Sequence, residues 1–317
     1  MKTSTRISLT IFVLIAMGVV GFKVTRIPQL EHNKKSMSDW MAELVSTYPR
    51  RNPEAIQALR AMGEPAVRQL AKIVEREDSV LSKKLLEHAD RIPVIAEVIP
   101  NKYWDRTMAA MALGELGTNA SSAVPALRKM SRDSDPNLAR VATAALVLVQ
   151  NEPIEKFISA SLDYDTTNAG DAYGVILYLG PHARKGIPAY LKELESTNNR
   201  IRLRALTVLT YICSESPECV PVFTNLLTDP DKLIRAHAIS GLSNYGEMAR
   251  SSASTVAEIV KDPDTTCRGI ALIFLQRVVP ASEFQSFAGV VRRATNDVDE
   301  VVRSLALQLL HEKQSDR

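Results

Sequence analysis

The feature that most constrains this chain is an arginine that returns at a nearly fixed spacing. The series is Arg106, Arg140, Arg202, Arg235, Arg268 and Arg303. Neighbours in it are separated by 33 to 35 residues, except that Ala169 stands where a member is expected between Arg140 and Arg202. A period of this length indicates an array of repeated units, because a single unit of that size cannot bury its own apolar face.

Signals for the start of a helix precede two of these arginines. Asp229-Pro230-Asp231 comes before Arg235, and Asp262-Pro263-Asp264 comes before Arg268. Aspartate caps helix N-termini, proline is favoured at the first helical position, and an acid there interacts well with the helix dipole. We therefore expect a helix to begin at each tripeptide.

A proline marks a second helix in each unit. The stretches around Leu116-Gly117 and Leu179-Gly180 predict that one helix ends there. Pro125 and Pro188 each follow nine residues after the leucine, and Pro221 keeps the same offset from Ile212. A proline at this fixed early position indicates that every unit contains two helices.

The composition agrees with an all-α fold. Apolar residues make up 45% of the 317 residues and aromatic residues only 5%, which favours closely packed helices over sheets. Residues 1–36 hold six basic side chains and one acidic one, so the rest of the chain has 33 basic and 35 acidic residues. A body this close to neutral lacks the basic footprint of a nucleic-acid binder, and we expect no nucleic-acid partner.

The N-terminus carries an apolar run over residues 7–22, preceded by Lys2 and Arg6. Sixteen helical residues span about 24 Å, a little less than a hydrocarbon core of about 30 Å. We expect residues 1–26 to be a signal-anchor that places the body outside the cytoplasm. The alternative is a cleaved signal peptide and a secreted body. Residues 27–37 are expected to form a polar tether.

The repeated units resemble HEAT repeats of the short HEAT-like type, with the pattern R-x-x-A-x-x-A-L-x-x-L-G. "DRTMAAMALGELG" matches it well, "IRAHAISGLSNYG" matches with substitutions, and "VRSLALQLL" is a truncated final copy. The resemblance extends over about residues 53–312. It implies a right-handed α-solenoid of stacked two-helix repeats, preceded by one apolar helix. It also implies that the recurrent arginines form a structural ladder with aspartates of neighbouring repeats.

We expect the solenoid to occupy residues 38–317, with about seven to eight repeats and an insertion at residues 78–102. Trp40 is expected to anchor a helix that caps the first repeat. The insertion contains apolar residues that either form a functional element or cover the end of the array. Both interpretations stay open at this point.

The function predicted from these features is that of a membrane-tethered scaffold that binds another protein. Its surface would be the concave face, which we expect the second helices to line. Exposed candidates there are Arg128, Lys129, Lys192, Glu193 and Asn225. The alternative is a solenoid enzyme or small-ligand-binding protein that uses residues 78–102.

No pattern in the sequence predicts a catalytic site, a metal site or a cofactor. The five histidines are scattered, and no glycine-rich phosphate loop or zinc-type cysteine cluster is present. Cys213 and Cys219 lie between the two helices of one unit. They are either a disulfide, which requires an oxidising compartment, or two free thiols. Cys267 is expected to be a small buried residue.

Overall fold

A computed structural model describes residues 30–76, 102–163, 169–214 and 216–315. The apolar segment expected at residues 7–22 and nearly all of the 78–102 insertion lie outside this range. Within the described ranges, every helix is too short or too polar to cross a membrane.

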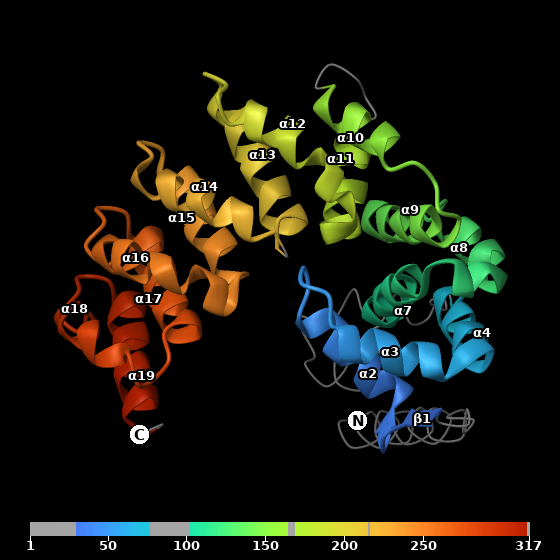
Figure 1. Ribbon diagram of the computed structural model, residues 1–317, viewed down its shortest axis with the longest axis horizontal. Coiled ribbons are helices and arrows are strands. Elements are labelled where there is room, and N and C mark those ends of the chain that lie inside the picture. Colours follow the sequence, from blue (N-terminus) through green and yellow to red (C-terminus); the bar gives the residue numbers. More distant parts are fainter. Residues whose placement is uncertain (1–29, 77–101, 164–168, 215, 316–317) are drawn as a thin grey trace, which may run out of the picture.

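Pairs of helices follow one another along a curved array (Figure 1). The pairs are α3 (Pro53–Ala61) with α4 (Gly63–Val74), α7 (Lys102–Leu116) with α8 (Val124–Met130), α9 (Pro136–Val149) with α10 (Glu155–Leu162), α11 (Ala169–Leu179) with α12 (Ile187–Glu193), α13 (Asn199–Ile212) with α14 (Val220–Asn225), α15 (Lys232–Ser243) with α16 (Ala253–Ile259), and α17 (Thr265–Val278) with α18 (Ala288–Ala294). A last helix, α19 (Glu300–Ser315), follows them. First helices of neighbouring pairs pack on each other, and each second helix packs on the next first helix.

Short turns, most of them 3-10 helices, join the two helices of a pair. These are η1 (Gly117–Ala123), η2 (Gly180–Gly186), η3 (Pro217–Cys219) and η5 (Gly246–Ser252); η4 (Leu226–Thr228) follows α14, and η6 (Phe284–Ser286) precedes α18. Gly117, Gly180 and Gly246 have φ values of 58°, 50° and 54°, a left-handed conformation that glycine adopts at little cost and that ends the first helix. Pro125 and Pro188 then lie in the first turn of α8 and α12, the position that the sequence pattern predicts.

The two acids of the Asp-Pro-Asp starts have different roles. Asp231 is the N-cap of α15 and accepts the Leu233 N–H at 2.8 Å, and Asp264 caps α17 in the same way at Cys267. Pro230 therefore lies before the cap and not inside the helix, which differs from our expectation. The first acid is left free to accept an arginine from the preceding repeat, as described below.

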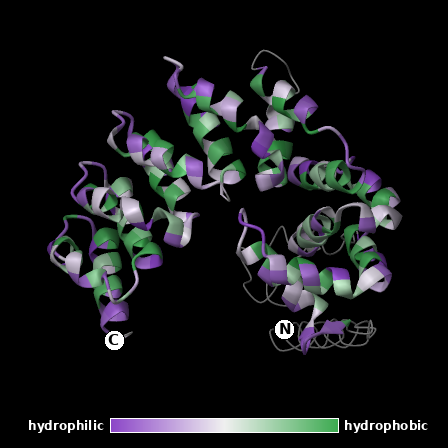
Figure 2. Cartoon of the chain, viewed as in Figure 1, coloured by the Kyte–Doolittle hydropathy of each residue, from purple (hydrophilic) through white to green (hydrophobic). Residues whose placement is uncertain are grey.

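The pairs are arranged so that one kind of connection faces each rim of the arc (Figure 1). The turns within pairs point toward its interior, and the described loops between pairs, such as residues 194–198, 229–231 and 260–264, lie on its outer rim. Figure 2 shows hydrophilic residues on these outer loops and hydrophobic residues along the packed helices. The helices thus run between the two rims, so the inner edge is formed mainly by the turns.

An N-terminal unit packs beside the first repeats. Strands β1 (Glu31–His32) and β2 (Lys35–Ser36) form a small antiparallel hairpin that leads into α2 (Met37–Ser46). The Trp40 side chain is 1% exposed, and its Nε1 donates to the His32 carbonyl at 3.1 Å. Residues 30–36 are therefore not the polar tether that we expected, because the buried Trp40 draws the hairpin onto α2.

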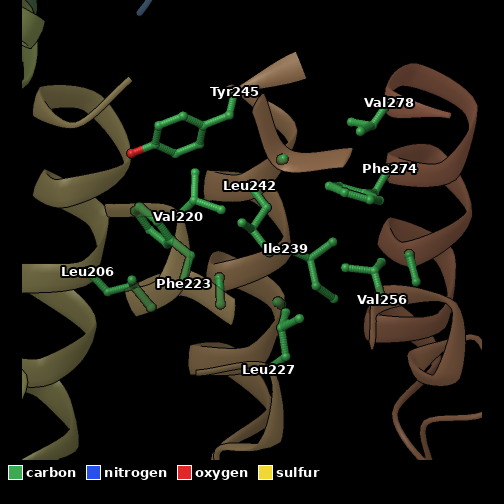
Figure 3. Packing of buried hydrophobic residues seen from close by; sticks show 14 of the residues in the cluster. Leu206, Val220, Phe223, Leu227, Ile239, Leu242, Tyr245, Val256, Phe274 and Val278 are labelled. Carbon is green, nitrogen blue, oxygen red and sulfur yellow. The ribbon is translucent and has the colours of Figure 1, made fainter. Parts of the chain in front are cut away.

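The core consists of two buried clusters that meet at Tyr178, which packs against both. Figure 3 shows part of the C-terminal cluster, where Phe223 lies between Leu206 and the side chains of α15. Phe223 and Phe274 are both fully buried. Each repeat thus contributes its apolar face to a core that is continuous along the array, the arrangement that makes single repeats depend on their neighbours.

Candidate interaction surface

Two neighbouring repeats are joined by paired hydrogen bonds between an arginine and an aspartate. Arg235 donates from Nε and Nη2 to both carboxylate oxygens of Asp262, each at 2.8 Å. Arg268 makes the same two bonds, also at 2.8 Å, with Asp297. Bidentate pairs of this kind fix orientation as well as distance.

Each of these arginines also holds the loop that precedes its own helix. Arg235 Nη1 donates to the carbonyls of Asp229 and Pro230 at 2.8 and 3.2 Å. The Asp262 carboxylate in turn accepts the backbone N–H of Asp264, the capping residue of α17, at 2.8 Å. The Arg235–Asp262 pair therefore connects the loop before α15 with the loop before α17 and with the start of α17.

The ladder continues towards the N-terminus with simpler contacts. Arg106 donates to Asp133 at 2.7 Å and to the Val74 carbonyl at 3.0 Å. Arg202 donates to Asp229. Among the four pairs that involve Arg106, Arg202, Arg235 and Arg268, the arginine side chains are only 10–16% exposed, so these contacts belong to the packed interior of the repeat junctions.

The ladder changes form at the fourth repeat, where Ala169 replaces the arginine. Arg140 pairs with Asp171 at 2.9 Å, an acid on α11 itself that is 69% exposed. The Arg140 side chain passes directly over Gly174 to reach Asp171, and a Cβ atom on Gly174 would lie 2.4 Å from Arg140 Cδ. Arg204 replaces the missing side chain by donating to the Ala169 carbonyl at 2.7 Å.

At the C-terminal end of the ladder, the hydrogen bonds of Arg303 within the described part of the chain all go to backbone carbonyl groups. Its Nη1 donates to Asp297 and Val298 at 2.7 and 3.0 Å. Leu307 is 58% exposed on the same helix, whereas Leu272, at the matching distance from Arg268, is 1% exposed. The outer side of α19 therefore resembles the junction faces that are covered elsewhere in the array.

Residues 47–52, which we call the strap, connect α2 to α3 and reach the inner rim of the arc (Figure 1). The Tyr48 hydroxyl donates to the Leu177 carbonyl, and its ring lies 5.7 Å from that of Tyr211. Ser214 Oγ donates to the Pro49 carbonyl at 3.3 Å. The strap therefore contacts α11, the end of α13 and the start of the turn that follows it.

The same strap extends to a third turn. Arg50 Nη1 lies 3.2 Å from the position that a Cβ atom would occupy at Gly246, and Tyr48 lies against Gly180. Burial raises the pKa of the Tyr48 phenol well above its ordinary value near 10. Tyr48 is therefore neutral in the folded protein throughout the physiological range and acts as a hydrogen-bond donor.

One further polar pair spans the inner rim near the strap. His182 Nε2 and Glu115 Oε1 are 3.0 Å apart, and both side chains are half-buried. Arg60 on α3 donates to the Glu115 carbonyl at 3.2 Å. These contacts connect the second repeat to the first and to the fourth.

The residues that we predicted as an exposed concave surface lie elsewhere. Arg128 and Lys129 are near the end of α8, Lys192 and Glu193 at the end of α12, and Asn225 at the end of α14. Because second helices run from the inner turns to the outer loops, these ends point to the outer rim (Figure 1). Glu193 is half-buried, and the other four are exposed.

The expectation was wrong because it assumed that helix sides, and not turns, would form the inner edge. Arg128 and Lys129 border an open groove of about 690 Å³ together with Glu75, Arg106 and Asp133.

The cysteines are placed around the turn after α13. Cys213 and Cys219 form a disulfide across it, with Cα atoms 6.2 Å apart. Cys267 is a buried free thiol whose pKa is raised to about 11 by burial. In the described part of the chain, no three His, Cys, Asp or Glu side chains are grouped so that they could hold a metal ion.

Comparisons with known proteins agree with this architecture. Residues 187–276 match the HEAT repeats family, and residues 105–133 match the PBS lyase HEAT-like repeat. A search of curated proteins found no match. The described part of the chain is thus an all-α array of stacked helix pairs, consistent with a HEAT-like solenoid, and its matches to HEAT-like repeats lie at residues 105–133 and 187–276.

Solved structures with a similar course of the chain have low sequence identity. The complex of CpcE and CpcF of phycocyanin lyase from Nostoc sp. PCC7120 is 20% identical, with a TM-score of 0.41, over 50% of this chain and 97% of that chain. The archaeal HEAT-like repeats protein from Thermococcus onnurineus NA1 is 14% identical, with a TM-score of 0.42, over 90% of this chain and 99% of that one. With scores this low, the likeness carries no argument about the function of this chain.

Proposed function

We propose that the chain is a protein-binding scaffold tethered to a membrane through residues 7–22, with the solenoid outside the cytoplasm. The observation that carries the proposal is the row of turns along the inner rim. Exposed side chains of η1, η2 and η5 succeed one another there, including Asn119, Arg184 and Glu247. Extended curved surfaces of this kind are how solenoids bind partners.

The proposed role is not enzymatic. The buried charged side chains of the ladder form hydrogen-bonded ion pairs with each other, as in the bidentate Arg235–Asp262 pair at 2.8 Å. An acid or base needs access to a substrate, and the interior of a repeat junction gives none. The geometry of these pairs therefore supports a structural role for them, and the exposed turns are the surface that we propose for binding.

In-cell photo-crosslinking of the full-length protein tests the scaffold. A photo-reactive amino acid would replace Arg184 on the inner rim or, as the matched control, Asn225 at the outer end of α14. We expect one dominant protein adduct from position 184 and a much weaker one from position 225. Equal adducts from both positions, or no protein adduct from either, would contradict the proposal.

Topology and tethering need a separate measurement. Intact-mass analysis of the mature protein distinguishes a retained anchor from a cleaved signal, since residues 1–26 are present only in the first case. Membrane fractionation with protease protection then assigns the side on which the solenoid lies. A protein that stays in the soluble fraction with residues 1–26 intact would contradict the tether.

A further inference from the structure

The boundary between the two buried clusters of the core runs through α9. Val141 and Ala145 of this helix belong to the N-terminal cluster, whereas Ala144 and Val147 belong to the C-terminal one. Among the residues that the structure describes, Tyr178 is the one partly buried side chain that packs against both clusters. The described array therefore consists of an N-terminal half, which ends with α9, and a C-terminal half, which begins with α10.

The polar ladder is weakest at the same boundary. Arg140 of α9 reaches across it to Asp171 of α11, and the two side chains are 29% and 69% exposed. The arginines of the four other aspartate pairs described above are only 10–16% exposed. An exposed ion pair contributes little stability, because water and salt screen its charges. The ladder thus holds the two halves together less firmly than it holds the repeats within each half.

Two spaces in the packing lie along this boundary as well. A small cavity of about 30 Å³ is lined by the strap together with parts of α7, α9 and α11. An open groove of about 640 Å³ runs beside α9, α10 and α11, and its lining includes Ala139, Ala172 and Val175. Side chains that border such spaces lack neighbours on one side and lose the contacts of a close-packed interior. The two halves can therefore move at this junction at a lower cost than elsewhere.

The strap crosses the boundary on the inner side of the arc. Tyr48 belongs to the N-terminal half, but its hydroxyl donates to the Leu177 carbonyl and its ring lies 5.7 Å from that of Tyr211. The Pro49 carbonyl accepts a hydrogen bond from Ser214 at 3.3 Å. Opening of the arc would separate the inner rim more than the outer rim. The contacts of the strap therefore oppose such an opening directly.

The contacts that hold the inner side are individually weak. Besides those of the strap, His182 of the C-terminal half pairs with Glu115 of the N-terminal half at 3.0 Å. The net free energy of one hydrogen bond is small, because the separated groups bond to water instead. Contacts of this size permit an open state of low population, which a ligand can then select.

We propose that the junction of α9 with α11 is a hinge and that the strap holds this hinge closed. Release of Tyr48 lets the two halves rotate relative to each other as rigid bodies, as in other hinge motions of proteins. The rotation increases the spacing between the turns of the inner rim. The inference concerns contacts within one chain and goes beyond the proposed scaffold function, whose binding surface this motion would reshape.

Double electron–electron resonance on the detergent-solubilised full chain tests the hinge. Spin labels on Asn119→Cys and Ser251→Cys measure the distance from η1 to η5, across the boundary. Labels on Arg184→Cys and Ser286→Cys measure the distance from η2 to η6, within the C-terminal half. All four positions are exposed. Cys267→Ala removes the free thiol, and labelling without reductant keeps the disulfide intact.

The variants weaken the strap in two steps. Tyr48→Ala removes both the hydroxyl bond and the ring contact, and Tyr48→Phe removes the bond alone. Tyr190→Phe is the matched control, because the Tyr190 hydroxyl bonds to Ser161 within the C-terminal half. Tyr48→Phe decides the case if Tyr48→Ala fails to fold.

In the wild type we expect one narrow distance for each pair of labels. Tyr48→Ala should add a second, longer distance across the boundary and leave the distance within the C-terminal half unchanged. Tyr48→Phe should give the same longer distance at a lower population, since one net hydrogen bond shifts the ratio of open to closed molecules by about fivefold. Tyr190→Phe should match the wild type for both pairs.

Three results would overturn the hinge. An unchanged distance across the boundary in both Tyr48 variants would mean that the repeat junctions alone set the curvature. A broadened distance within the C-terminal half would mean that this half is not rigid. A longer distance in Tyr190→Phe would mean that opening does not depend on the strap. Because no partner takes part in this measurement, its failure is distinct from a failure of the scaffold function, which the crosslinking experiment tests.

Discussion

The Tyr48 hydroxyl donates a hydrogen bond to the carbonyl of Leu177, although the two residues are 129 positions apart in the sequence. This contact crosses from the N-terminal unit to the fourth repeat. It is the central contact of the strap, because the same tyrosine also lies against Tyr211 and Gly180. A solenoid usually has contacts only between neighbouring repeats, so the strap adds long-range coupling to a fold that otherwise lacks it.

Replacing Tyr48 with phenylalanine should destabilise the strap by about 1 kcal/mol, the usual net value of one hydrogen bond. Tyr48→Ala should cost more, since the ring contact with Tyr211 is also lost. Hydrogen exchange followed by mass spectrometry measures the effect locally. We expect faster exchange in residues 177–186 and 211–214 and unchanged exchange in α17, and faster exchange over the whole array would contradict a local role.

Arg268→Ala should destabilise the protein by about 2 kcal/mol, because it leaves the shielded carboxylate of Asp297 without its two hydrogen bonds. Arg268→Lys should restore only part of this, since an ammonium group cannot make the bidentate pair. Urea unfolding provides the measurement. As a control, Glu258→Ala removes the exposed pair with Lys261 and should leave the unfolding midpoint unchanged.

A double-mutant cycle provides the decisive comparison for the ladder. Arg268→Ala combined with Asp297→Ala should cost clearly less than the sum of the two single changes, because the partners act as a unit. Strict additivity would mean that the contact contributes nothing as a pair.

Stability should fall in acid partly through Asp297. The hydrogen bonds from Arg268 hold the pKa of this carboxyl below its ordinary value near 3.8. The folded pKa is thus lower than the unfolded one, so the contribution is fully present above about pH 4 and is lost as the pH falls through the folded pKa. Urea midpoints measured from pH 6 to pH 2.5 should decline less in Asp297→Asn than in the wild type.

The exposed Glu300→Gln is a matched control for that experiment, and its pH profile should follow the wild type. An Asp297→Asn profile parallel to the wild type would show that this carboxylate does not contribute to the acid response.

The three cysteines should differ in their reaction with an alkylating reagent in denaturant. Without reductant we expect labelling of Cys267 alone, and with reductant labelling of Cys213 and Cys219 as well. In the folded protein Cys267 should react slowly, since burial raises its pKa to about 11 and little thiolate forms. Mass spectrometry identifies the labelled peptides.

Reduction of the Cys213–Cys219 bridge should lower the stability by about 2 kcal/mol, the chain-entropy value for so short a loop. Labelling of all three cysteines before reduction would mean that the isolated protein lacks the bridge.

Gly241→Ala should destabilise the protein by about 1–3 kcal/mol even though alanine favours helices. A Cβ atom at this position would lie 2.5 Å from the buried ring of Phe223. Gly289→Ala in α18 is the control, because no neighbour lies within 4 Å of its added Cβ. Thermal unfolding should show a lower midpoint for the first variant and an equal or higher one for the second.

Local signals in the sequence were enough to predict the repeats. Arg202, Arg235 and Arg268 recur at one period, and Pro125 and Pro188 lie at one fixed offset within their repeats. Both patterns can be recognised without knowing any long-range contact, and the helices begin and end near the predicted places. The division of roles in Asp-Pro-Asp was not predicted, because either acid can cap a helix when only the sequence is considered. The arginine from the preceding repeat decides which one does.

The strap could not be predicted from the sequence. Tyr48, Arg50 and Arg51 stand in an ordinary connection between two helices, with no pattern that distinguishes them. The contacts of Pro49 with Ser214 and of Arg50 with Gly246 depend on how far the array curves, and that curvature accumulates from small rotations at each junction. Because this curvature cannot be predicted from one repeat, we expected the sides of the second helices, and not the turns, to line the inner rim.

The strap also has a consequence for the order in which the protein is completed during its synthesis. Pro49 leaves the ribosome 165 residues before Ser214, whose hydroxyl holds its carbonyl. At common elongation rates of about 5–20 residues per second, this delay is roughly ten to thirty seconds. The strap is therefore made early but reaches its final contacts only after the helix pairs that hold it have been made, and until then the nascent chain exposes Tyr48 to any chaperone that recognises aromatic side chains.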